Sequence, residues 1–309
     1  MTTKSKKRSI LGIGSFKHKL DKVRIIFFQG NSFSTQRTYE LDESCAMFGN
    51  AQFDVLRKTV LYIHSYLEGP EHESVNTIVD AYLQRNDHNV LIMDWSQLAK
   101  GNYLIDVVPN AKQLATKMSE VVLDWVDEGM DVNRFHVIGH GIGGQMAGMI
   151  GRCAHRKSEG ETKLMRVTAL DPPAAFPLGA RVNEKDAEFV DIIFTDAWFH
   201  STPKSSGTVN FWPSCPQRKS KLSDDRRAWQ MWAETVQPSE QPVFLSVHAK
   251  GLNDFKKGRV NHSEIVQMGI DCPMSAKRGD YFLQVNLNQP YAKGIKGLKY
   301  EKSRIDLIT

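Results

Sequence analysis

Residues 135–144 constrain the fold more than any other segment, because a short apolar run passes directly into a cluster of glycines. The sequence is Phe-His-Val-Ile-Gly-His-Gly-Ile-Gly-Gly, and its first half has the composition of a buried strand. Glycine tolerates both a positive φ and the close approach of neighbouring backbone, so the cluster favours a very tight turn. We therefore predict a strand, a sharp turn at Gly141 and a helix that begins directly after it.

Three interpretations fit this glycine pattern. A glycine-rich helix start can hold a phosphate group, and G-x-G-x-G is superficially similar to a dinucleotide-binding fingerprint. That fingerprint requires the first strand–helix unit of a fold and an acidic residue about 20 positions later, whereas several strands precede residue 135. The third interpretation is a nucleophile elbow, G-x-S-x-G, in which Gly141 stands at the position of the serine.

Apolar periodicity predicts strands that alternate with helices over the first two hundred residues. The predicted strands cover residues 23–28, 60–64, 90–94, 135–138, 167–170 and 190–194, and the predicted helices cover residues 74–85, 111–128 and a segment after Gly141. Residues 198–223 are rich in Ser, Pro, Gly and Lys and read as a loop. This alternation predicts an α/β fold with a mostly parallel central sheet and helices on both faces.

The length of 309 residues and a hydrophobic content of 41% are sufficient for one large domain. We predict a basic, flexible N-terminal segment at residues 1–20, a single domain at 21–295 and a C-terminal tail at 296–309. No apolar run reaches the roughly 18 residues of a membrane span, and residues 9–18 lack the apolar core of a signal peptide. The sequence as given predicts a cytoplasmic protein, with an extracellular location as the alternative if its N-terminus is incomplete.

Charge and cysteine content indicate neither nucleic acid nor metal as a partner. The net charge is +5, but the basic clusters are scattered and accompany no nucleic-acid-binding motif. The four cysteines form no C-x-x-C pair, so no zinc site is predicted. We predict no cofactor and no metal, and the sequence leaves the oligomeric state open.

A series of ordered motifs resembles a known family. The motifs are Tyr62-Ile63-His64, Asp94-Trp95-Ser96, Gly101-Asn102-Tyr103, Val137-Ile138-Gly139-His140, Ala169-Leu170-Asp171-Pro172, Phe189-Val190-Asp191-Ile192-Ile193 and Tyr281-Phe282-Leu283-Gln284-Val285-Asn286. Over residues 23–294 the chain resembles the pancreatic-lipase-like family of animal neutral lipases and phospholipases, especially the insect branch with its yolk-protein relatives. The resemblance implies an α/β-hydrolase fold.

The resemblance also assigns positions to the catalytic triad of serine, aspartate and histidine. The serine corresponds to Gly141, the aspartate to Asp171 and the histidine to Asp225, so only Asp171 is kept. The oxyanion hole corresponds to the backbone N–H of Ile142 and the loop around Tyr66. An aspartate before proline at a strand end also commonly starts a turn, which is a second interpretation of Asp171.

A missing nucleophile and base predict a catalytically inactive homologue that binds lipid or another apolar ligand, or that acts in storage or interaction. The rival prediction is a lipase or other carboxylic ester hydrolase that uses displaced residues. Ser65 and His140 are the candidates for such a pair. Their alternative roles are structural: His140 as part of the turn, and Ser65 as the occupant of the family's usual glycine position.

Three further family features are altered. Cys215 remains, but its expected disulfide partner is Ser223, which fits a reducing compartment. Where some members bind calcium, Glu184 and Asp186 are the only carboxylates, too few for a tight site, so we interpret them as surface charge. The lid segment, residues 216–222, is short and basic, and its cations either contact anionic headgroups weakly or serve solubility.

Overall fold

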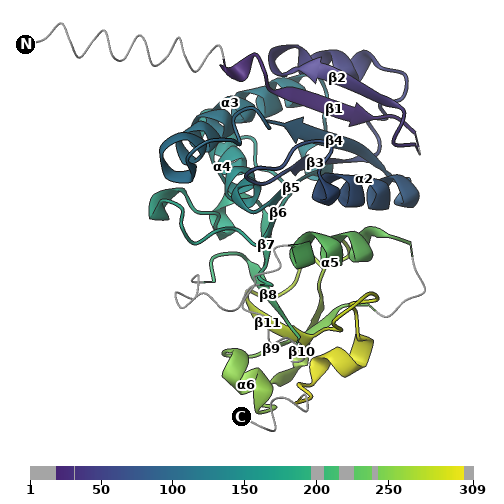
Figure 1. Ribbon diagram of the computed structural model, residues 1–309, viewed down its shortest axis with the longest axis vertical. Coiled ribbons are helices and arrows are strands. Elements are labelled where there is room, and N and C mark those ends of the chain that lie inside the picture. The colour runs from purple at the N-terminus through teal and green to yellow at the C-terminus, as the bar shows by residue number, and fades with distance from the viewer. Residues whose placement is uncertain (1–18, 31, 196–204, 216–225, 239–242, 303–309) are drawn as a thin grey trace, which may run out of the picture.

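The computed structural model describes residues 19–30, 32–195, 205–215, 226–238 and 243–302 of the chain (Figure 1). Its elements in chain order are β1 (Arg24–Phe28), β2 (Gln36–Glu40), η1 (Leu41–Gly49), β3 (Lys58–Ile63), α2 (Glu73–Arg85), β4 (His88–Asp94), η2 (Tyr103–Val107), α3 (Val108–Asp127), η3 (Val132–Arg134), β5 (Phe135–His140), α4 (Ile142–Lys157), β6 (Arg166–Leu170), η4 (Leu178–Ala180), η5 (Glu184–Asp186), β7 (Phe189–Ile193), β8 (Val209–Ser214), α5 (Arg226–Val236), β9 (Leu245–His248), α6 (Leu252–Lys256), β10 (Asn261–Gln267), β11 (Gly279–Gln284) and η6 (Gly294–Leu298). No described helix is sufficiently long and apolar to cross a membrane.

One eleven-stranded sheet runs through the molecule in the order β10-β9-β11-β8-β7-β6-β5-β3-β4-β1-β2. The strands from β4 to β11 in this order pair in parallel, while β1 and β2 at one side and β9 and β10 at the other are antiparallel additions. The predicted mostly parallel sheet is therefore confirmed. Parallel strands place their carboxyl ends at one edge, so the turn after β5 lies beside those after β3 and β6.

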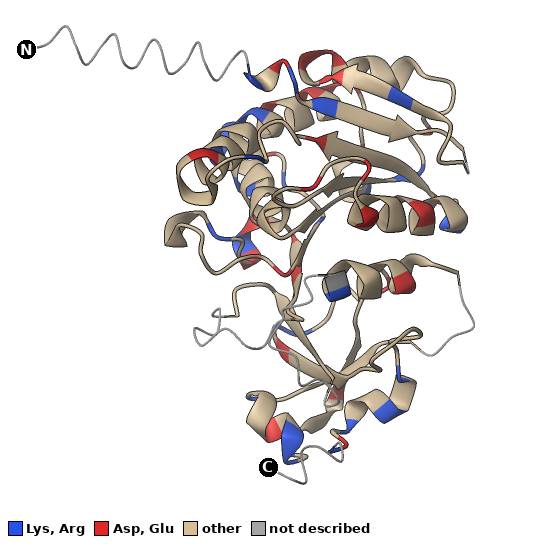
Figure 2. Ribbon diagram, in the orientation of Figure 1, with Lys and Arg blue, Asp and Glu red and all other residues tan. Residues whose placement is uncertain are grey.

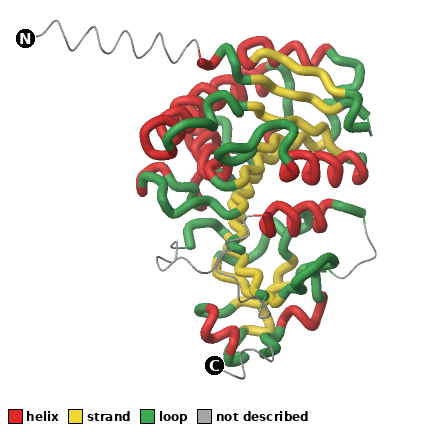
Figure 3. The backbone as a smooth tube through the Cα atoms, in the orientation of Figure 1, coloured by secondary structure: helices red, strands yellow, loops and turns green. Residues whose placement is uncertain are grey.

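Helices cover both faces of this sheet (Figures 1 and 3). Helices α3 and α4 pack on one face and α2 and α5 on the other, which buries successive strand residues in opposite directions. In β3, for example, Leu61 and Ile63 belong to the core under α3 and α4, and Val60 and Tyr62 to the core under α2 and α5. A strand buried on both faces is almost continuously apolar, which explains the uniform composition of the central strands.

The six predicted strands and three predicted helices are all present, with ends that differ by a few residues. The prediction of a loop over residues 198–223 is wrong at β8, because Val209, Asn210 and Phe211 are buried in the sheet. The flanking Ser, Pro and Gly residues hide this short strand from a periodicity search. Residues 196–204 and 216–225, including the predicted lid, lie outside the described residues.

A candidate ligand site at the strand-to-helix turn

Gly141 forms the sharp turn between β5 and α4. Its backbone has φ 54° and ψ −123°, and its amide donates a hydrogen bond to the carbonyl of Leu170 over 2.8 Å. L-amino acids rarely adopt this positive φ, whereas glycine does so at little cost. The predicted strand, turn and helix are confirmed, and the turn keeps a conformation that would strain any other residue.

The neighbouring glycines are required by close backbone packing. A Cβ atom on Gly143 would lie 2.2 Å from the carbonyl oxygen of Ile63, and one on Gly139 would lie 2.0 Å from that of Gly143. Neither distance is compatible with a real side chain, and backbone atoms cannot move aside as a flexible side chain can. The close approach fixes α4 against β3 and so sets the position of Gly141.

Ser65 occupies the space beside Gly141 that a side chain at position 141 would need. A Cβ built on Gly141 would lie 2.1 Å from the Ser65 Oγ atom and 3.0 Å from the Ser65 Cβ atom. A side chain at 141 would therefore require the Ser65 hydroxyl to rotate away from its present position. The sequence marked Ser65 as unusual for the family, but sequence alone could not show that the two positions pack against each other.

A buried carboxylate, Glu68, organises the polar groups behind the turn. Its Oε2 atom accepts hydrogen bonds from the Ser65 amide at 2.8 Å and the Ser74 hydroxyl at 2.9 Å, and its Oε1 atom pairs with His140 Nδ1 at 2.9 Å. Burial by itself would raise the pKa of Glu68, but His140, the Ser65 amide and the Ser74 hydroxyl lower it to about 2. Sequence analysis missed Glu68, because it lies in no recognisable motif.

Histidine–serine contacts bear directly on the rival prediction of a displaced catalytic pair. Among the described residues, His72 Nδ1 lies 3.0 Å from the Ser74 hydroxyl, where His72 caps the start of α2. Ser74 is fully buried and donates to Glu68, so its oxygen is not accessible to a substrate. No hydrogen bond joins Ser65 Oγ to a histidine in the described part of the chain, and His140 faces Glu68.

Asp171 follows β6 at the same edge of the sheet. It has a positive φ of 46°, and its amide donates to the carbonyl of Ile193 over 2.9 Å. Its carboxylate accepts hydrogen bonds from the Thr195 amide at 2.6 Å and from the Thr195 hydroxyl. Asp225, the predicted counterpart of the histidine, lies outside the described residues. The predicted triad assignments therefore stay predictions.

Tyr66 and Ile142, the predicted oxyanion-hole residues, flank the turn. The Tyr66 hydroxyl donates to the carbonyl of Gly101 over 2.9 Å, and its ring packs edge-on against Tyr103. Ile142 is buried and begins α4, whose first amide groups have no carbonyl partner within the helix. The structure thus brings Gly141, Ile142, Ser65 and Tyr66 together, while their roles toward a ligand stay a prediction.

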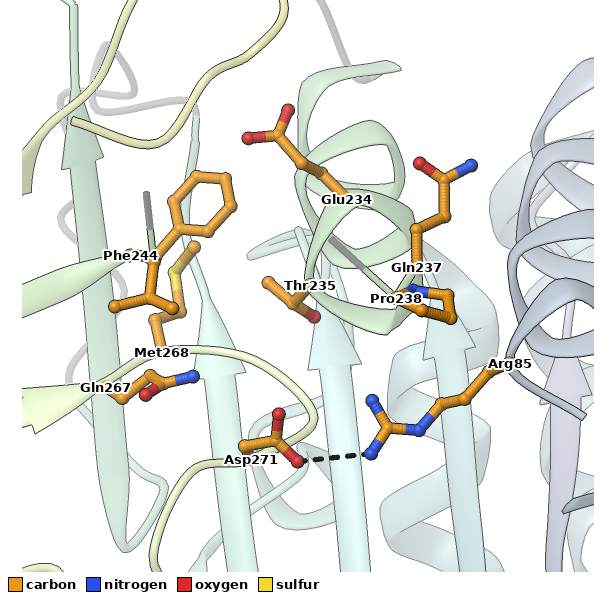
Figure 4. Close-up of a pocket in the computed structure, with 10 residues that line it drawn as sticks. Arg85, Glu234, Thr235, Gln237, Pro238, Phe244, Gln267, Met268 and Asp271 are labelled. Atoms are coloured by element: carbon orange, nitrogen blue, oxygen red, sulfur yellow. Dashed lines mark hydrogen bonds and ion pairs between the residues drawn. The ribbon is translucent and has the colours of Figure 1, made fainter. Parts of the chain in front are cut away.

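Two cavities lie on the described surface at different distances from the turn. One, of about 360 Å³, begins at Pro172 next to Asp171 and is lined by Gln145, Pro172, Pro173, Ala174, Leu178, Gly179, Arg181, Val182, Asn183, Phe194 and Ser206. The other, of about 260 Å³, lies between the ends of α2 and α5, where Arg85 forms an ion pair with Asp271 at 3.4 Å (Figure 4). The first is mostly apolar and extends from Pro172, beside Asp171, to Gln145 in the first turn of α4, so it is the better place for an apolar ligand.

The candidate calcium and cysteine residues have other surroundings. Asp186 is fully buried and forms an ion pair with Arg152 at 2.8 Å, so its interpretation as surface charge is wrong. Glu184 pairs instead with Arg278 at 2.7 Å. Within the described ranges no group of three or more His, Cys, Asp or Glu side chains could hold a metal ion. Cys45, Cys153, Cys215 and Cys272 are free thiols.

Comparison with known proteins identifies the family to which this arrangement belongs. The chain matches the Lipase family over residues 2–220, well over half of its length. It is a member of the Lipase family. The strand order and the strand-to-helix turn of this lipase-family protein are those of an α/β-hydrolase fold.

The curated relatives of this lipase-family protein include both lipases and vitellogenins. Vitellogenin-3 of Drosophila melanogaster is 29% identical over 187 residues, which cover 57% of this chain and 43% of that protein. Lipase member H of Danio rerio is 28% identical over 182 residues, which cover 55% of this chain and 39% of that protein. Vitellogenin-2 of Ceratitis capitata is 31% identical over 53% of this chain and 40% of its own length. The chain therefore spans less than half the length of these relatives.

Proposed function

We propose that this lipase-family protein binds the acyl chain of a lipid beside Gly141 without hydrolysing it. The observation that carries the proposal is the geometry at the turn. Gly141 has the backbone angles of a strained turn but no side chain, and Ser65 Oγ fills the space that its side chain would need. A nucleophile at 141 is thus absent, and the Ser65 hydroxyl occupies the place where its side chain would begin.

The loss of catalysis follows from the chemistry of acyl transfer. Hydrolysis through a covalent intermediate requires an attacking oxygen and a base that takes and returns its proton. Glycine supplies no attacking atom, and an aspartate at position 225 would be a poor base near neutral pH. Removing the nucleophile or the base of such a triad lowers turnover by about 10⁶-fold in a well-studied serine protease.

Support for lipid binding comes from the apolar surface around the turn. The cavity of about 360 Å³ next to Asp171 is lined mainly by Pro, Ala, Leu, Val and Phe side chains, which suit an acyl chain. Leu67 before α2, Leu104 and Ile105 in η2 and Leu178 in η4 are 64–80% exposed. Leu178 also lines the cavity, and an exposed aliphatic group at a cavity favours an apolar ligand over a polar one.

A reactivation experiment with matched variants tests this proposal. Variant S65G/G141S/D225H supplies nucleophile and base and removes the steric conflict at Ser65, whereas G141S/D225H retains that conflict. We expect esterase activity on p-nitrophenyl esters only in the triple variant, and we expect fatty acid or phospholipid to be detected by mass spectrometry in the purified wild type. Hydrolysis by the wild type, or a lipid-free wild type that binds no fluorescent fatty acid, would overturn the proposal.

A hydrolytic function is the second candidate, and it has one observation in its favour. The Ser65 hydroxyl lies where a side chain at 141 would begin, so a hydroxyl oxygen is present beside the turn. A fluorophosphonate probe distinguishes the two functions. Stoichiometric labelling of the wild type that is lost in S65A would establish Ser65 as a reactive nucleophile, and unlabelled wild type supports the non-catalytic proposal.

Two vitellogenins among the relatives suggest a storage role that would also need no catalysis. We place this role within the same proposal, because a stored lipid would occupy the same cavity.

For the cellular compartment, we propose a reducing one on the basis of the four free cysteines. Alkylation of the native tissue protein, denatured without reductant, should modify all four thiols. Four unmodified cysteines would instead indicate disulfides and export.

A further inference from the structure

Opposite net charges characterise the two ends of this chain. Residues 19–195 contain 18 Lys and Arg against 24 Asp and Glu, a net charge of −6, whereas residues 243–302 contain 10 against 5, a net charge of +5. Figure 2 shows basic ribbon at the lower end of the molecule, on α6 and on the segment that contains η6. Such asymmetry orients a protein toward a charged partner more strongly than its total charge suggests.

Five lysines of the basic end form one surface, which we call the basic face. They are Lys256 and Lys257 at the end of α6, and Lys296, Lys299 and Lys302 in and after η6, and all five are exposed. The Lys256 ammonium lies 5.3 Å from the centre of the Tyr300 ring, which joins the two segments. Phe255 of α6 and Leu298 of η6 belong to the same buried cluster, and the Tyr300 ring that follows η6 packs edge-on against Phe255, so the chain after η6 lies against α6.

The basic face is not neutralised by neighbouring carboxylates. Other cations of this end have acidic partners: Arg259 pairs with Asp254, Lys277 with Glu264 and Lys293 with Glu301. None of the five lysines of the basic face forms an ion pair with any residue that the structure describes. Five exposed positive charges without internal partners are available to an external anion.

We propose that the basic face docks on the anionic headgroups of a phospholipid surface. The side chain of Ile295 is 77% exposed next to Lys296, so an aliphatic group projects from among the lysines. Lysines that surround an exposed aliphatic residue suit the boundary between headgroups and acyl chains. A nucleic-acid surface would favour arginine forks and open aromatic rings, whereas this face has lysines, and its Tyr300 ring packs edge-on against Phe255 and under Lys256.

The test is sedimentation of the full-length protein with vesicles. Wild type should bind phosphatidylcholine vesicles that contain about 30% phosphatidylserine and should bind pure phosphatidylcholine weakly, because each lysine near an anionic surface strengthens binding about fivefold. Variant K256Q/K296Q/K299Q should lose about 100-fold in affinity by the same relation. Control variant K22Q/K100Q/K112Q changes the net charge equally on the acidic part of the chain, at three exposed lysines, and should bind as wild type does.

Ile295 separates a lipid surface from other polyanions. Variant I295S should weaken vesicle binding several-fold at raised salt, where the aliphatic contribution remains while the charges are screened. Equal losses in the two triple variants, or single-stranded RNA that binds as tightly as the vesicles and is insensitive to I295S, would overturn the proposal. The basic face is far in sequence from Gly141, so its loss should leave the fatty-acid content of the purified protein unchanged, and the two proposals can fail separately.

Discussion

At the scale of single residues, the close packing of Ser65 against Gly141 leads to the most specific prediction about stability. A substitution of Gly141 places a Cβ atom 2.1 Å from Ser65 Oγ and forces an L-residue to adopt a φ of 54°. We expect G141A to destabilise the protein by about 1–3 kcal/mol through overpacking and backbone strain. Urea unfolding of G141A beside S65G/G141A measures the steric part, which the second glycine should remove. Equal free energies of unfolding for the two variants would contradict the packing argument.

Glu68 makes stability depend on pH in a defined direction. Its pKa in the folded protein is lowered from 4.5 to about 2, so its contribution is complete above about pH 4.5 and is lost as the pH falls toward 2. The size of this contribution is about 3 kcal/mol by linkage. The difference in unfolding free energy between wild type and E68Q should therefore be constant from neutral pH down to about 5 and then decrease. E71Q, at an exposed position of the same loop, is the control; a difference that stays constant down to pH 2 would refute the role of Glu68.

At the scale of elements, the buried ion pair between Arg166 and Asp191 joins segments that are far apart in the sequence. Two hydrogen bonds link the side chains at 2.7 and 3.0 Å, and Arg166 also donates to the carbonyls of Gly269 and Ile270 at 2.8 Å. This arrangement fastens the segment after β10 to strands β6 and β7.

Breaking this pair should be costly because it leaves a charge buried without its partner. We expect D191A to lower the free energy of unfolding by about 3–5 kcal/mol, and R166M/D191L to lower it less. E188A, which removes an exposed partner of Lys163 at the edge of the same sheet region, should cost at most about 1 kcal/mol. Denaturant titration of the three variants gives the comparison. A loss of unfolding free energy for D191A as small as that for E188A would show that the Arg166–Asp191 ion pair contributes little to stability.

The sequence predicted elements well where apolar periodicity is strong and poorly where the fold extends the sheet with short strands. The helix α3 was predicted because its apolar residues recur at three- and four-residue intervals, and β5 with α4 because glycines mark the turn. Strands β2, β9, β10 and β11 were missed: β2 and β10 are largely exposed and polar, β9 has only four residues, and β11 begins with Gly and Asp. Glu68 and the Ser65 contact were beyond prediction, since both depend on the distance between loops that the sheet brings together.

At the scale of the whole molecule, the core is completed by residues after 220. These residues lie beyond the part of the chain that matches the Lipase family. Trp229 and Trp232 of α5 and Tyr281 of β11 belong to the same buried cluster as Val75 and Ile78 of α2, and all five are at most 1% exposed. The C-terminal part of the chain, residues 243–302, which carries the basic face, thus shares its buried core with the sheet that carries Gly141.

This continuity predicts that a fragment of residues 1–220 does not fold. Without α5 the large apolar residues of α2, β3 and β5 on that face would be exposed to water, and the two buried tryptophans alone represent about 3–5 kcal/mol each when truncated. We expect the fragment to show little cooperative unfolding by circular dichroism and to be digested by trypsin much faster than the full chain. Because marginal stabilities are only about 5–15 kcal/mol, the loss of this layer exceeds what the remaining sheet can supply. A cooperative, protease-resistant fragment would show instead that residues 1–220 form an independent domain and that residues 243–302 are not needed for it to fold.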